Sequence, residues 1–168
     1  MIKGIANFFS TPSRARTLVI IAFIILLLVL IYWWRASRKK RQQEKQFQND
    51  YQTLTQGGGS GGGQKPTYLS TNYTQYADRI YAAGCSGAFC YGTDEEAIYE
   101  VFNKMQNDLD VLLLTKAFGL REPRGEWCTP LDDNCDYSLG EWLQTELDAD
   151  EFKEINNILT KKGITYQL

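Results

Sequence analysis

Apolar and polar residues divide the chain into stretches with different patterns. From Thr17 to Trp34 the chain reads TLVIIAFIILLLVLIYWW, without a charged residue. Residues 35–64 are polar and include a glycine-rich run, and from residue 65 onward apolar residues recur at the three- and four-residue spacing of amphipathic helices. The pattern predicts an all-α protein with an N-terminal arm at 1–16, a transmembrane helix at 17–34, a juxtamembrane segment and flexible linker at 35–64, and a compact helical C-terminal module at 65–168.

The apolar run has the length and the flanks of a transmembrane helix. A bilayer core of roughly 30 Å requires about 20 residues of helix, which the run reaches together with its flanks. A cleaved signal peptide fits less well, because its apolar region is only about 7–15 residues long and ends at a cleavage site made of small residues. The aromatic and basic residues that close the run are typical of a membrane interface: Tyr32, Trp33, Trp34, Arg35, Arg38, Lys39, Lys40 and Arg41.

Charge and cysteine usage favour opposite sides of the membrane. The basic cluster at 35–41 outweighs the basic residues before the run, so the positive-inside rule places the C-terminal module on the cytoplasmic side. Two close pairs of cysteines, Cys85/Cys90 and Cys128/Cys135, would form local disulfides in an oxidising compartment. Their spacings do not match a zinc knuckle. We follow the charge rule for orientation and leave the redox state open, with Cys128–Cys135 as the expected pair in the oxidised protein.

The stretch between the apolar run and the module is expected to be a tether. The residues 41–56, RQQEKQFQNDYQTLTQ, are polar and are predicted to continue the membrane helix for a few turns before fraying. The run Gly57–Gly63, GGGSGGG, favours a flexible coil. The sequence therefore predicts a folded module on a flexible leash at a membrane surface.

Capping signals and apolar stripes predict about five helices in the C-terminal module. The stretches 72–83 and 108–118 carry apolar residues at helical spacing and end before a glycine. Three pairs of residues have the spacing of a capping box, in which the first side chain accepts from a helix N–H and the Glu reaches back to the cap: Thr93/Glu96, Ser138/Glu141 and Asp148/Glu151.

Composition argues against an enzyme and against nucleic-acid binding. The C-terminal module carries 9 Lys/Arg and 18 Asp/Glu, a net charge of −9, whereas a phosphate-binding face needs a basic surplus. The protein has no histidine, which removes the commonest general base and metal ligand. No other acid–base pair or activated nucleophile has a recognisable spacing, so we do not predict catalytic activity.

Two blocks of the module resemble the annexin repeat. They are Gly92-Thr93-Asp94-Glu95 followed by Ile98, and LGEWLQTEL at 139–147 followed by Phe152 and Leu159. The annexin repeat is a compact bundle of five helices, and the resemblance covers about residues 73–162 as a single repeat. Single modules of this kind also resemble small proteins of Bacteroidetes and of their viruses.

The annexin resemblance implies a calcium site. In that family a glycine–threonine turn and a later carboxylate bind calcium. The resemblance places this turn at Tyr91, Gly92 and Thr93 and singles out Gly92, Thr93 and Glu146 as the site. Calcium accepts backbone carbonyls and a bidentate Glu readily. Cys90 departs from the family, because it stands where annexins have the first glycine of the turn, and its β-carbon restricts the carbonyl geometry. The alternative, which we favour, is a capped helix start without a cation.

These observations favour a membrane-anchored structural or tethering protein that presents a helical interaction module near a lipid bilayer. Its expected partners are the bilayer and other structural proteins of an assembly, such as a membrane-containing bacteriophage virion. The corresponding location is the internal membrane of the virion or a bacterial inner membrane. The alternatives are a calcium-dependent annexin-like membrane-binding module and a component of an envelope or secretion complex.

Overall fold

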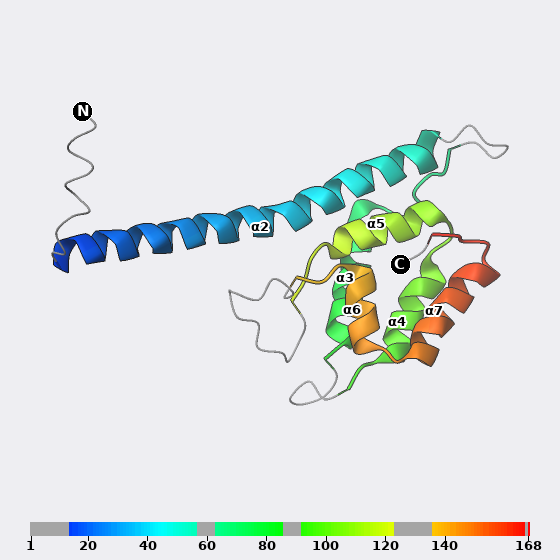
Figure 1. Ribbon diagram of the computed structural model, residues 1–168. Coiled ribbons are helices and arrows are strands. Elements are labelled where there is room, and N and C mark those ends of the chain that lie inside the picture. The colour runs from blue at the N-terminus through cyan, green and yellow to red at the C-terminus, as the bar shows by residue number, and fades with distance from the viewer. Residues whose placement is uncertain (1–13, 57–62, 86–91, 123–135, 167) are drawn as a thin grey trace. The chain divides into compact units, whose positions relative to one another are not determined.

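A computed structural model describes residues 14–56, 63–85, 92–122, 136–166 and 168, with the side chains of 14–16, 18, 32, 33 and 35–37 left aside. The regular structure in these residues is helical, which confirms the all-α prediction (Figure 1). Their one β-type contact is an antiparallel bridge between Arg121 and Tyr137, with hydrogen bonds of 2.9 and 3.0 Å. The helices are α2 (Arg14–Gln56), α3 (Ser70–Ala83), α4 (Glu95–Lys104), α5 (Asp108–Phe118), α6 (Leu139–Glu146) and α7 (Ala149–Lys161).

The chain forms two compact units, Met1–Arg41 and Gln42–Leu168, which we call the first and second units. The boundary between them lies within α2. The last turns of this helix, which the sequence analysis assigned to a tether, therefore belong to the second unit. The helix does not fray there, because its residue types have good helix propensity and because side chains one turn apart contact each other. Gln48 donates to Glu44 at 3.0 Å, and the ring centroids of Phe47 and Tyr51 lie 5.6 Å apart.

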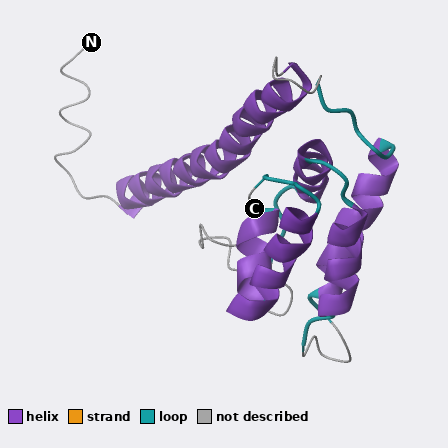
Figure 2. Cartoon of the chain, turned by 90° about the vertical axis from the view of Figure 1, so that its right-hand side faces the viewer, coloured by secondary structure: helices purple, strands orange, loops and turns teal. Residues whose placement is uncertain are grey.

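The core of the second unit is built from the apolar stripes of α3 to α7. Helix α3 packs against α4 and α5, and α4 packs against α7. In Figure 2 the described residues that connect these helices are drawn as loops. Helix α4 buries Ile98, Val101 and Phe102 completely, and α6 buries Leu139, Trp142 and Leu143 completely. The largest fully buried side chains include Trp142, Phe102, Ile80, Ile98, Leu143 and Ile155.

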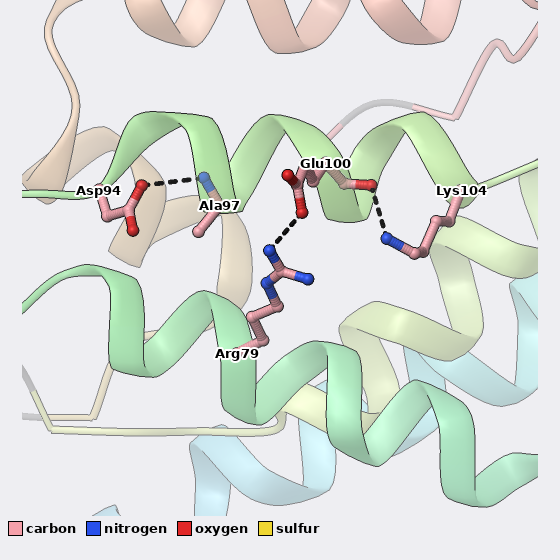
Figure 3. A network of polar contacts seen from close by, with 5 residues as sticks. All are labelled: Arg79, Asp94, Ala97, Glu100 and Lys104. Carbon is pink, nitrogen blue, oxygen red and sulfur yellow. Dashed lines mark hydrogen bonds and ion pairs between the residues drawn. The ribbon is translucent and has the colours of Figure 1, made fainter.

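Two of the three predicted capping boxes are present. The Ser138 N–H donates to Glu141 at 2.8 Å, and the Asp148 N–H donates to Glu151 at 2.7 Å. The Thr93/Glu96 box is wrong. Helix α4 begins one residue later than predicted, and its cap is Asp94, whose carboxylate accepts from the Ala97 N–H at 3.1 Å (Figure 3).

One buried carboxylate joins three separate parts of the second unit. Asp110 lies in the first turn of α5 and is fully buried. It accepts hydrogen bonds from the Tyr73 hydroxyl at 2.6 Å and from the backbone N–H groups of Thr67 and Gln106, both at 2.9 Å. Burial raises the pKa of Tyr73, and its hydrogen bond to Asp110 raises this pKa further. The three donors offset the cost of burying the carboxylate.

A second carboxylate of the same turn, Asp108, holds the C-terminal segment. It accepts from the backbone N–H groups of Thr165 and Tyr166, both at 2.6 Å, and from the side-chain amide of Gln64 at 3.0 Å. Burial acts to raise the pKa of the Asp108 carboxyl, but the hydrogen bonds outweigh burial and hold this pKa below its ordinary value.

Gln64 also fixes the chain where it leaves the glycine-rich run. Its backbone N–H donates to the Leu54 carbonyl in α2 at 2.9 Å, while its side-chain carbonyl accepts from the Leu109 N–H at 2.9 Å. Of the predicted linker, residues 57–62 lie outside the described residues. The chain on either side of the run is therefore held together by a hydrogen bond, and both sides belong to the second unit.

We expect Asp110→Asn to lower the free energy of unfolding by about 2–3 kcal/mol, because one of its three donors would meet an NH₂ group in place of an oxygen. Urea unfolding of the full chain in detergent micelles measures the change. Asp78→Asn is the matched control, since it removes an ion pair with Arg121 in which the Asp78 side chain is 63% exposed. The control should cost less than about 1 kcal/mol. Equal losses in the two variants would contradict the role assigned to Asp110.

The lowered pKa of Asp108 predicts a specific acid sensitivity. A carboxyl whose pKa is lower in the folded state adds stability above its unfolded-state pKa of about 4, and this stability is lost as the pH falls through the folded-state pKa. Unfolding free energies at pH 7 and at stepwise lower pH should show the wild type losing more stability than Asp108→Asn in this acid range. Parallel pH profiles for the two proteins would contradict the prediction.

Candidate functional site

The first unit carries a continuous exposed apolar surface. The large apolar side chains described between Val19 and Ile31 are all exposed, by 42% to 61%. Trp34 follows at 58%, and the Arg38 guanidinium carbon lies 3.3 Å from the centroid of its ring. An exposed apolar surface of this size favours association with lipid or with another protein, because removal of apolar surface from water is the main driving force for such binding.

The predicted membrane segment is only partly described. Within the described residues, no helix combines the length and the apolar character needed to cross a membrane. The run 17–34 includes Leu18, Tyr32 and Trp33, whose side chains lie outside the described residues, as does that of Arg35. The other predicted interface residues are exposed, except for Lys39, which is half-buried. The exposed ones are Trp34, Arg38, Lys40 and Arg41. The transmembrane interpretation of 17–34 stays a prediction.

The three residues of the predicted calcium site lie close together. Gly92 has a φ of 102°, in the region that favours glycine. The Thr93 hydroxyl, free because Asp94 caps α4, donates to the backbone carbonyl of Glu146 at 3.2 Å. The side chain of Glu146 turns toward the end of α3, since a β-carbon on Gly84 would lie 3.2 Å from its carboxyl carbon.

The chemistry at this corner does not yet amount to a metal centre. The described residues contain no group of three or more His, Cys, Asp or Glu side chains arranged to hold a metal ion. Tyr91 and Cys90, which would complete the annexin-like turn, lie outside the described residues. The contact through Thr93 is a hydrogen bond between the turn and the end of α6, and the calcium site stays a prediction.

The cysteine pairing is also only partly described. Cys85 is disulfide-bonded. Cys90, Cys128 and Cys135 lie outside the described residues, so no disulfide joins two described residues. The predicted pairs therefore remain untested.

The second unit contains a cavity of about 260 Å³ that the sequence analysis did not predict. The last turns of α2 form one wall, α5 and α6 form the others, and residues of the C-terminal segment complete it. Its lining includes Gln46, Phe47, Asp50, Lys116, Gln144 and Tyr166. No local sequence pattern predicts this cavity, because it forms only when residues 42–56 pack as part of the second unit.

One wall of this cavity includes a positively charged side chain, that of Lys116. The Lys116 ammonium forms an ion pair with Glu44 and lies 4.7 Å from the centroid of the Phe47 ring. Asp50 has no hydrogen bond or ion pair with any residue of the described part of the chain. Burial raises the pKa of Tyr166, and the negative charge of Asp50 raises it further.

Comparisons with known proteins add no identification. The chain matches no protein-family model, no curated protein and no solved structure.

We expect Asp94→Ala to lower the free energy of unfolding by about 1 kcal/mol through loss of the α4 cap. The loss should be the same with calcium and with a chelator, because the Asp94 carboxylate accepts from the Ala97 N–H. Thermal unfolding followed by near-UV circular dichroism measures it. Glu96→Ala is the control, since Glu96 was the predicted capping partner and should now have a smaller effect. The reverse order of the two losses would contradict the observed cap.

Proposed function

We propose that the protein is a membrane-anchored structural tether that holds a small helical interaction module at a lipid bilayer. The observation that carries the proposal is the exposed apolar surface from Val19 to Ile31, followed by Trp34 with Arg38 stacked on it. A helix that is apolar on all sides, with an aromatic residue and basic residues at its end, is the usual form of a single-pass anchor. The run Thr17–Trp34 contains no charge that would oppose insertion.

The second unit suits a role in association. It carries all 20 Asp and Glu residues of the protein and 10 of the 18 Lys and Arg residues. The charged residues of the first unit are all basic. A basic segment next to an apolar helix favours the anionic surface of a membrane, and an acidic unit is repelled by it. This distribution of charge supports a membrane anchor in the first unit and a protein-binding module in the second unit. The internal membrane of a virion and a bacterial envelope complex are settings that use such a part.

A second candidate is a calcium-dependent annexin-like membrane-binding module. The contact between Thr93 and the Glu146 carbonyl favours it, because this contact brings together the two blocks that carry the annexin resemblance. Calcium bound to the native state alone would raise the melting temperature, and Glu146→Gln would abolish the increase. We expect no calcium-dependent increase in the wild type. An increase that Glu146→Gln removes would favour this second candidate over a calcium-independent tether.

The anchor is tested by placing charges in the apolar run without shortening it. In Ile24→Asp/Leu28→Asp, two carboxylates would stand one turn apart, at a cost of about 5–7 kcal/mol for insertion. The wild-type chain should stay with membranes after carbonate extraction, and the double variant should be released. Leu69→Asp is the control, because Leu69 is an exposed leucine of the second unit, at 76%, and its substitution should leave the protein in the membrane. Carbonate-resistant association of the double variant would contradict the proposal.

A further inference from the structure

We propose that the cavity between α2, α5 and α6 receives the cationic end of a lysine or arginine side chain from a protein partner. The proposal deepens the tether function proposed above, since it names the kind of partner that the second unit would engage. It rests on the charges and contacts of the cavity walls.

Asp50 carries an uncompensated charge at the cavity wall. Asp50 lines the cavity and is half-buried, yet its carboxylate has no hydrogen bond or ion pair among the described residues. A partly desolvated carboxylate without a partner is unfavourable, and a cation placed beside it recovers the lost interaction with water. The one ammonium on the cavity wall, that of Lys116, is already paired with Glu44 outside the lining. Lys116 therefore does not serve as the partner of Asp50.

The remaining walls of the cavity offer acceptors for a cation. Phe47 lines the cavity, but the Lys116 ammonium already lies over its ring, so the other walls must hold an incoming cation. Gln46 and Gln144 add side-chain amides that have no hydrogen-bond partner among the described residues. An amide oxygen is a suitable acceptor for an ammonium or guanidinium group. The cavity thus combines the carboxylate of Asp50 with two neutral acceptors.

The volume of the cavity and the net charge of the second unit favour a protein side chain as the occupant. At about 260 Å³ the cavity is smaller than the roughly 300–1,000 Å³ of pockets that enclose whole small molecules. The second unit has a net charge of −10, from 20 acidic and 10 basic residues, so its field attracts a basic protein surface. A single basic side chain that projects from such a surface fits both the size and the charge.

The test uses the full chain in detergent micelles and two matched probes. N-acetyl-lysine-N-methylamide carries the ammonium, and N-acetyl-norleucine-N-methylamide has the same backbone and a similar aliphatic chain without it. NMR shifts of the Gln46 and Gln144 side-chain amides report occupation of the cavity. We expect saturable shifts with the lysine probe and none with the norleucine probe. Asp50→Asn should weaken binding of the lysine probe at least 10-fold.

The control variant removes the same charge elsewhere. Glu154→Gln lies on α7, outside the cavity lining, and should leave binding of the lysine probe unchanged. The proposal is overturned if both probes shift the amides equally, if Asp50→Asn binds as the wild type does, or if neither probe binds. Because the experiment is done in detergent, it does not depend on membrane insertion. Failure of the anchor proposal would appear in the carbonate extraction alone.

Discussion

The second unit depends on two carboxylates in the first turn of α5. The chain on either side of the helices has little regular structure at 63–69 and 163–166, so its backbone N–H groups need acceptors from side chains. Asp110 accepts from the N–H groups of Thr67 and of Gln106, the latter between α4 and α5. Asp108 accepts from the N–H groups of Thr165 and Tyr166. Both carboxylates also lie at the positive end of the α5 dipole, which favours their charge. One helical turn therefore fixes both the entry and the exit of the bundle.

Local patterns in the sequence were sufficient for the helices but not for the contacts between them. The apolar stripes and two capping boxes were predictable because each depends on residues three or four positions apart. The hydrogen bonds of Asp108 and Asp110 were not predictable, because they join residues far apart in the sequence. Asp108 is 57 positions from Thr165, and Asp110 is 43 positions from Thr67. The wrong α4 cap has the same cause. Thr93 and Asp94 are both good caps, and both also make contacts outside α4: Thr93 with Glu146 of α6, and the Asp94 N–H with the Ala83 carbonyl.

The candidate site shows the same limit. The exposed apolar run was evident from composition alone, whereas the cavity depends on residues 42–56, whose polar, glutamine-rich sequence resembled a tether. Once Gln64 is bonded to both Leu54 and Leu109, the last turns of α2 become a wall of the second unit. In the tether that we propose, the glycine-rich run is then a connection within the second unit.

Hydrogen exchange tests most directly whether the two aspartates hold the unit together. The backbone amides of Thr67 and Gln106, bonded to Asp110, should exchange as slowly as the central amides of α5, through unfolding of the whole second unit. The amide of Tyr166, bonded to Asp108, should be protected in the wild type and lose its protection selectively in Asp108→Asn. Exchange of all three at the rates of an unstructured peptide, while α5 stays protected, would contradict the account.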